Sequence, residues 1–289
     1  MRLKLLVISL LLSCGAPTPD QPAPSTVIAD PLPLPMCTLP NNEQITVFTD
    51  AYNGCHQPNP GLYHGALCFA NEQWACDVIH NFLTETTLLK DLIHPDANHG
   101  GSGSRDELIG HLLYIAKTHD KNHANKLIDM IQHNANRVCT DATDNRCDVT
   151  PTMYGLMRIV WNHIGLTPTK NMLISNIGDD HTLLIEASTA PIGYQLHLIA
   201  LQLLIRQHTN TWSTTMDATS KELLNRMPNN LLIRYINGLD VSKELDTAIS
   251  DQNANPPKVI RNWPWARETT GNEDTPAGYL FLKNLILKK

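Results

Sequence analysis

The chain has 289 residues, of which 42% are hydrophobic and 17% are charged. This length and apolar share suffice for one large domain or two small ones with a real core. The 28 acidic residues outnumber the 22 basic residues and give a formal net charge of −6, which excludes a generic nucleic-acid binder and a basic membrane-surface protein.

Residues 1–13 have the composition of a secretion signal. Arg2 and Lys4 supply positive charge, and residues 5–12 form an almost unbroken apolar run. A helix of that length covers about 12 Å, whereas the hydrocarbon core of a bilayer is roughly 30 Å thick. The run is therefore predicted to be a cleaved signal peptide rather than a membrane-spanning anchor.

The end of this run reads Leu-Leu-Ser-Cys-Gly at residues 11–15, and the motif resembles the lipobox of bacterial lipoproteins. The resemblance implies that the signal is cut before Cys14 and that Cys14 becomes the lipidated first residue. Gly15 after the cysteine resembles the pattern that permits export to an outer membrane. The alternative is an ordinary signal peptide in which Cys14 is incidental.

A proline-rich tether is predicted over residues 14–40. Proline disfavours both helix and central strand, so an extended polyproline II conformation is expected there. The prolines of this segment are Pro17, Pro19, Pro22, Pro24, Pro31, Pro33, Pro35 and Pro40. The predicted folded domain, residues 41–289, would stand clear of the bilayer at the end of this tether.

The cysteines indicate a disulfide framework. Once Cys14 is assigned to lipid, an even number remains, and in an exported protein such cysteines form disulfides. Residues 68–76 and 139–147 share one spacing between their terminal cysteines. A metal cluster is the alternative, but the CxxC and CxxH spacings of such sites do not occur. Nearest-neighbour pairing predicts the disulfides Cys37–Cys55, Cys68–Cys76 and Cys139–Cys147.

From residue 41 onward the patterns are helical. We predict an all-α fold class, a single multi-helix domain of about eight to ten helices with disulfides. Several helices are predicted to start at a capping residue, and three of these starts combine a capping threonine with a proline in the first turn: Thr150-Pro151, Thr189-Ala190-Pro191 and Thr275-Pro276. Strand-like alternation occurs only at residues 44–48. The predicted helices cover residues 72–89, 108–116, 120–137, 154–164, 192–207, 220–227, 230–237, 241–249 and 279–287.

Residues 192–205 are apolar almost all round, which predicts a helix that is buried on most sides. Helices in layers produce such a position, either in an α/α toroid or in a layered bundle. Together with scattered Trp, His and acidic residues, this pattern resembles the helical toroids of glycan-active enzymes over residues 60–289. The resemblance rests on no diagnostic motif and transfers no catalytic residue.

The first candidate site is a glycine-rich loop at residues 99–104. It leads into a helix start, where free N–H groups attract an anion. Arg105 can add a bidentate contact to a carboxylate or phosphate, and Asp106 offers an acidic group. The structural alternative is a capping box of Ser104 and Glu107 that only starts the helix.

The second candidate site would carry acid–base chemistry. Tyr194 and His197 lie one turn apart on the predicted buried helix, shortly after Glu186. Glycosidases and polysaccharide lyases use these residue types for proton transfer, so Asp106, Glu186, Tyr194 and His197 are the candidate catalytic residues. The alternative is a core tyrosine and histidine whose polar atoms bind neighbouring backbone.

Substrate binding would involve Arg105, His181 and two tryptophans near the end of the chain. The rings of Trp263 and Trp265 can stack on sugars, or they can instead close the helical domain.

Two further patterns have some features of metal sites. His119 and His123 have the i,i+4 spacing of a zinc pair, but Asp120 is the expected helix cap, so His119 should precede the helix and lie off that face. Residues 141–148 offer acidic oxygens without the order of an EF-hand. The sequence therefore predicts no metal and no cofactor.

Two functions remain open. The chain is either a non-catalytic binding or structural module of a bacterial cell envelope, or a polysaccharide-active hydrolase or lyase. In both cases its expected partners are a membrane, reached through the lipid on Cys14, and a glycan ligand, with no nucleic acid.

Overall fold

The computed structural model describes residues 36–38, 44–46, 60–84, 105–138, 147–167, 180–252 and 276–287. All described residues belong to one unit, Leu34–Lys289. The predicted lipid site Cys14 and the tether lie outside the described residues. None of the helices that are described is long and apolar enough to cross a membrane.

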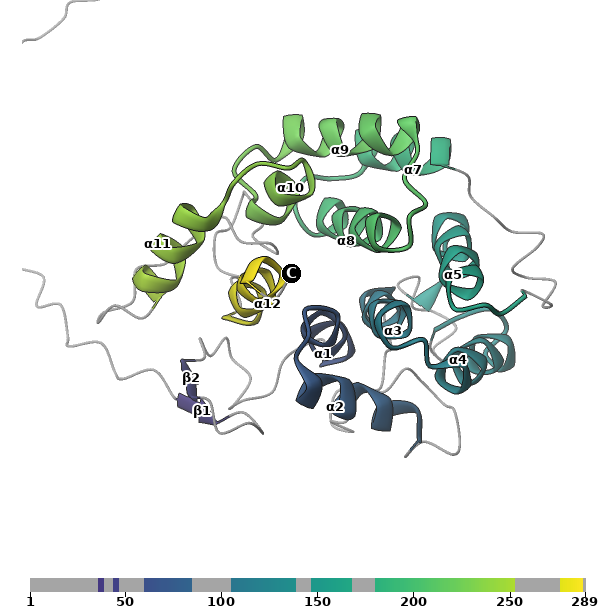
Figure 1. The fold of residues 1–289 in the computed structure, drawn as a ribbon. Coiled ribbons are helices and arrows are strands. Elements are labelled where there is room, and N and C mark those ends of the chain that lie inside the picture. The colour runs from purple at the N-terminus through teal and green to yellow at the C-terminus, as the bar shows by residue number, and fades with distance from the viewer. Residues whose placement is uncertain are drawn as a thin grey trace, which may run out of the picture. The chain divides into compact units, whose positions relative to one another are not determined.

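The predicted all-α fold class is confirmed (Figure 1). Among the described residues, Met36–Thr38 and Gln44–Thr46 form a short antiparallel strand pair with Cys37 opposite Ile45, and the second strand lies in the segment of predicted strand-like alternation. The elements are β1 (Met36–Thr38), β2 (Gln44–Thr46), α1 (Pro60–Phe69), α2 (Gln73–Thr84), α3 (Arg105–Thr118), α4 (Lys121–His133), α5 (Pro151–His163), α7 (Asp180–Thr189), α8 (Tyr194–His208), α9 (Thr214–Arg226), α10 (Leu231–Ile236), α11 (Ser242–Gln252) and α12 (Pro276–Leu287).

Helix starts follow the capping chemistry of the sequence. The side chain of Asp120 accepts a hydrogen bond from the backbone N–H of His123 and caps α4. Thr150 caps α5 in the same way, with Pro151 in the first turn. The start predicted after Thr189 is wrong, because α7 ends at that residue and α8 begins at Tyr194 behind Gly193, which makes no side-chain cap.

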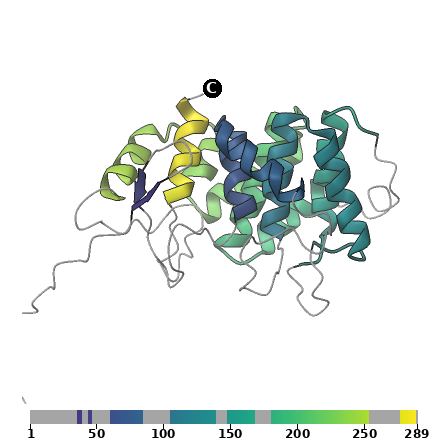
Figure 2. The same ribbon diagram turned by 90° about the horizontal axis from the view of Figure 1, so that it is seen from below.

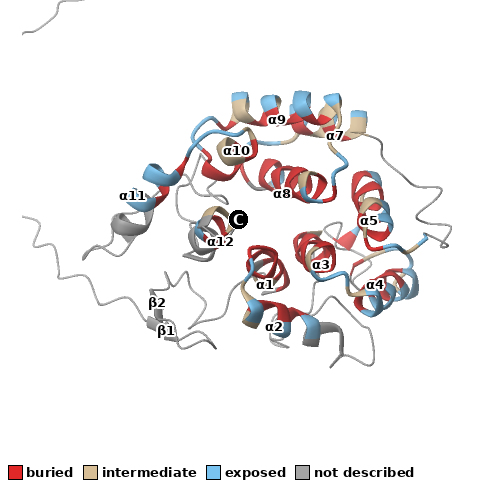
Figure 3. Ribbon diagram, viewed as in Figure 1, coloured by how far each residue is buried: buried red, intermediate tan, exposed pale blue. Residues whose placement is uncertain are grey.

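Helix α8 is the predicted helix that is buried on most sides. It packs against α3, α5, α7, α9 and α10, and its residues 198–206 are all buried. In Figure 3, α8, α3 and α1 are almost entirely buried, whereas α4 and α9 each turn an exposed face to solvent. Helices α3, α4 and α5 are seen nearly end-on in Figure 1 and side-on in Figure 2, so their axes run in a similar direction.

Helices α1 and α3 approach each other backbone to backbone. A Cβ atom at Gly65 would collide with the carbonyl group of Gly110, and one at Gly110 would collide with the backbone of Gly61. At the same crossing the buried carboxylate of Glu107 accepts a hydrogen bond of 2.6 Å from the N–H of Gly61. Glu107 is thus part of the packing between two helices, while Ser104, its partner in the alternative capping box, lies outside the described residues.

The predicted disulfide Cys68–Cys76 is confirmed and joins the last turn of α1 to the first turn of α2. Cys147 is also disulfide-bonded. Its predicted partner Cys139 lies outside the described residues, as does Cys55, so the other two pairings remain predictions.

Candidate functional site

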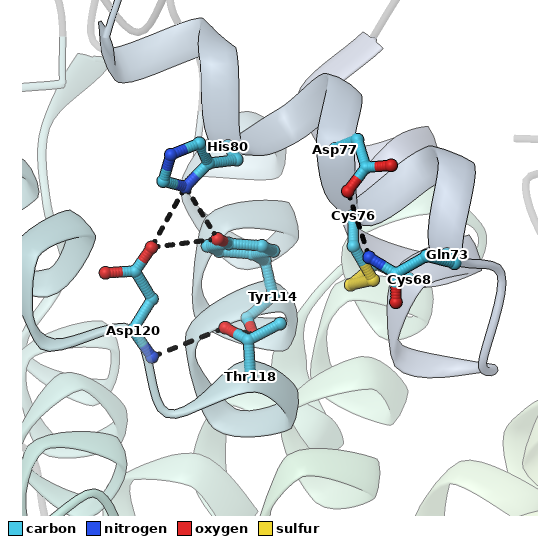
Figure 4. The surroundings of a disulfide bond; sticks show 8 residues. All are labelled: Cys68, Gln73, Cys76, Asp77, His80, Tyr114, Thr118 and Asp120. Carbon is cyan, nitrogen blue, oxygen red and sulfur yellow. Dashed lines mark hydrogen bonds and ion pairs between the residues drawn. A yellow bond between two sulfur atoms is a disulfide. The ribbon is translucent and has the colours of Figure 1, made fainter.

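The polar cluster with the most converging side chains lies where α2, α3 and α4 meet (Figure 4). His80 comes from α2 and Tyr114 from the last turns of α3. Asp120 caps α4, and His123 lies in the first turn of that helix. Only two residues separate α3 from α4, and the tight link places the Asp120 carboxylate beside the end of α3. We call His80, Tyr114, Asp120 and His123 the polar cluster.

Three polar atoms of the cluster form a closed triangle. The hydroxyl of Tyr114 donates to Oδ2 of Asp120 at 2.9 Å. Nδ1 of His80 lies 3.0 Å from the same oxygen and 2.9 Å from the hydroxyl. The other carboxylate oxygen, Oδ1, accepts from the backbone N–H of His123 at 2.9 Å. Both oxygens of Asp120 therefore have fixed directions, and Oδ2 is the one that faces His80.

His123 is held from behind by a second histidine, His111 of α3. Nδ1 of His111 and Nε2 of His123 are 2.7 Å apart, and the side chains are 1% and 2% exposed. Burial lowers the pKa of both rings, that of His123 to about 3. Both imidazoles are therefore neutral near pH 7, and one N–H joins them.

The charges of the cluster follow from its surroundings. Burial acts to raise the pKa of Asp120, but hydrogen bonds from His123, Tyr114 and His80 together lower it. Burial and the hydrogen bond to Asp120 raise the pKa of Tyr114. At neutral pH the cluster thus holds a carboxylate, a neutral phenol and a neutral buried imidazole.

The cluster is reachable from solvent on the side of His80. The His80 side chain is 47% exposed, whereas that of Asp120 is 18% exposed. A carboxylate, two imidazoles and a phenol around one point can bind a cation, and they can also pass a proton between each other.

The sequence-predicted residues at the start of α3 are only partly accessible. Asp106 is buried beside Glu107, and burial raises the pKa of Glu107 well above its usual range, with the Asp106 charge as a further cause. Arg105 lies close enough to Glu186 of α7 to influence its carboxyl group. Arg105 and Glu186 are thus two predicted site residues that lie near each other.

Glu186 is half-buried between α7 and α5. The hydroxyl of Thr152 lies 3.0 and 3.1 Å from its two oxygens. Burial raises the pKa of Glu186, while the Thr152 hydrogen bond and the Arg105 charge act in the opposite direction.

The remaining predicted site residues are dispersed. His181 is exposed on α7, and His197 is 1% exposed inside α8, where burial lowers its pKa to about 3. Tyr194 begins α8, but its side chain is not among those described, and Trp263 and Trp265 also lie outside the described residues.

The sequence analysis singled out Asp120 and His123 of the polar cluster and missed His80 and Tyr114. It correctly placed Asp120 as the cap and His119 before the helix: His119 is exposed, and its ring packs against His163 with centroids 4.8 Å apart. The histidine that His123 meets in the polar cluster is instead His80, from another helix, with ring centroids 6.3 Å apart. No spacing rule connects the two, because His80 lies on α2 and His123 on α4.

The chain matches no protein-family model, no curated protein and no solved structure. Its function must therefore be argued from its own residues.

Proposed function

We propose that this protein is a lipid-anchored, non-catalytic binding module of a bacterial cell envelope, exposed to an oxidising compartment. The observation that carries the proposal is the disulfide Cys68–Cys76 between α1 and α2. Disulfides persist in exported proteins and are rare in the reducing cytosol. The signal-like residues 1–13 and the lipobox-like Cys14 also favour export, with an outer membrane as the destination.

A binding role is supported by where the polar residues lie. Glu107 contacts the backbone of α1, and His197 lies in the core of α8. Neither position leaves room for a substrate. The polar cluster at His80, by contrast, is open to solvent and has its charged oxygen already oriented.

Lipidation is tested by expressing the full chain in a bacterium with two membranes, in the presence of a labelled fatty acid. We expect label on the wild-type protein, recovery in the membrane fraction, and loss of both with Cys14→Ser. Ser13→Ala is the matched control and should keep the label, because a small residue still precedes the cysteine. An unlabelled wild type, or a labelled Cys14→Ser variant, would contradict the anchor.

A second candidate function, acid–base cleavage of a polysaccharide, is favoured by Glu186 alone. Its half-buried carboxyl, with a raised pKa and Arg105 nearby, has the character of a general acid. Turnover of a glycan panel by the wild type that disappears with Glu186→Gln would support this function. A wild type that cleaves none of the panel would leave the binding module as the function.

A further inference from the structure

We propose that His80, Asp120 and His123 bind one divalent transition-metal ion, with Zn²⁺ as the best match. Each residue offers one ligand atom, and these atoms all lie within 4.8 Å of one another. Ligands bound to a tetrahedral zinc ion are about 3.3 Å apart, as follows from bonds of about 2.0–2.1 Å. Small rotations of the side chains would therefore close the three around an ion. The sequence alone had predicted no metal here.

The backbone holds two of the three ligands in place before any ion arrives. Oδ1 of Asp120 is fixed by the N–H of His123, so Oδ2 is directed toward His80, 3.0 Å away. His80 follows Cys76 by one turn of α2, and the disulfide ties that turn to α1. Little conformational freedom would be lost on binding.

His111 has the position of an orienting partner. Metal-binding histidines almost always use their second nitrogen in a hydrogen bond that fixes the ring. Nε2 of His123 is engaged by His111 at 2.7 Å, which leaves Nδ1 of His123 for the ion. His111 is thus a positioning residue and not a ligand.

The donor set selects the class of ion. Two imidazoles and one carboxylate suit Zn²⁺ and its neighbours, whereas Ca²⁺ and Mg²⁺ take sets made of oxygen. Three protein ligands leave a fourth position, and the hydroxyl of Tyr114 lies within 2.9 Å of both His80 Nδ1 and Asp120 Oδ2. The phenol can fill that position or bind a water there. The exposed side of His80 gives the ion its entry route.

The site is tested by calorimetric titration of ZnCl₂ into the full chain, purified in detergent and stripped with a chelator. We expect one tight site in the wild type. His80→Ala and Asp120→Asn should each weaken it by at least about tenfold, because even outer partners of metal sites are worth about 10- to 100-fold. Asn at position 120 still caps a helix, and His80 is exposed, so both variants should fold, which circular dichroism checks.

His119→Ala is the matched control. It removes an exposed histidine from the same link, and its ring packs on His163, away from the cluster. It should bind Zn²⁺ like the wild type. A second readout is the melting temperature, which Zn²⁺ should raise in the wild type and in His119→Ala but not in His80→Ala.

The proposal is overturned if the wild type has no tight site, or if His80→Ala and Asp120→Asn bind as tightly as the wild type. It does not depend on lipidation: a chain that fails the fatty-acid labelling test can still bind zinc, and a labelled chain can still fail to bind it.

Discussion

The two ends of helix α3 use carboxylates in opposite ways. At its start, Glu107 is buried against the backbone of α1, and burial raises its pKa. Just past its end, Asp120 receives hydrogen bonds from three donors, which lower its pKa, and it remains partly open to solvent. The first carboxylate serves the packing of two helices, and the second keeps a charge that is available to a ligand. The start of α3 therefore contributes to the stability of the fold, and the region just past its end can bind a ligand.

The largest effect on stability is expected from Gly110→Ala, which disrupts the packing of α3 against α1. The new methyl group would collide with the backbone of Gly61 and Leu62, and backbone cannot rotate away as a side chain can. We expect a loss of about 3 kcal/mol or more in the free energy of unfolding, measured by denaturant titration. Lys117→Ala on the same helix should stay within about 0.5 kcal/mol. Equal stability of the two variants would show that α1 and α3 are not in such close contact.

Removing the disulfide should have the next largest effect on stability, and it should also affect the polar cluster. The double variant Cys68→Ser, Cys76→Ser frees a short loop in the unfolded chain, which costs about 2–3 kcal/mol. It also loosens the turn of α2 that carries His80, so Zn²⁺ binding should weaken as well. Denaturant titration and calorimetry measure the two effects. A variant that loses stability but binds zinc unchanged would show that the disulfide does not position His80.

Glu107→Gln tests the buried carboxyl through pH. In the wild type the folded state keeps this proton to a higher pH than the unfolded state, because burial raises the pKa. Stability is therefore lost as pH rises above the ordinary glutamate value, by up to about 1.4 kcal/mol per pH unit. Gln should remove that loss, so the variant should gain stability relative to the wild type between pH 5 and pH 7. A variant with the same pH profile as the wild type would contradict the raised pKa.

Asp120→Asn should change the pH profile in the opposite direction and by less. The folded-state pKa of Asp120 is lowered, so its charge contributes stability above the ordinary aspartate value, and this contribution is lost as pH falls through the folded-state pKa. Asn keeps the cap but not the charge, and a loss of about 0.5–1 kcal/mol at pH 7 is expected. Unfolding at pH 7 and pH 3 measures it. If the stability difference between the wild type and Asp120→Asn is as large at pH 3 as at pH 7, the effect comes from capping and not from the charge.

Local signals in the sequence predicted the elements whose causes are local. Asp120 and Thr150 were recognised as caps, and the continuous apolar surface of residues 192–205 correctly indicated a buried helix. Helix α1 was missed because two glycines lower its intrinsic helix propensity, and tertiary packing, above all against α3, compensates for them.

For a related reason, the sequence indicated Asp120 and His123 of the polar cluster but not His80 and Tyr114. Spacing rules connect residues on one helix, whereas His80 and His123 come from α2 and α4 and meet only when these two helices pack against each other and against α3. Helix α7 was also missed, because His181 and Glu186 in this segment were interpreted only as site residues. Its first residue, Asp180, forms an ion pair of 2.6 Å with the buried Arg206 of α8. Tertiary contact decides the role of each of these residues.

The crossing of α1 and α3 also limits how this protein can diverge in evolution. Solvent-facing positions can change freely, and this includes the exposed His80 of the proposed zinc site. Gly65 and Gly110 cannot be replaced while the two backbones touch, and a side chain at position 61 would displace the Glu107 carboxylate. Any distant descendant that keeps this pair of helices must therefore carry G-x-x-x-G on the first and E-x-x-G on the third, and that pattern can identify a relative whose other residues no longer resemble this chain.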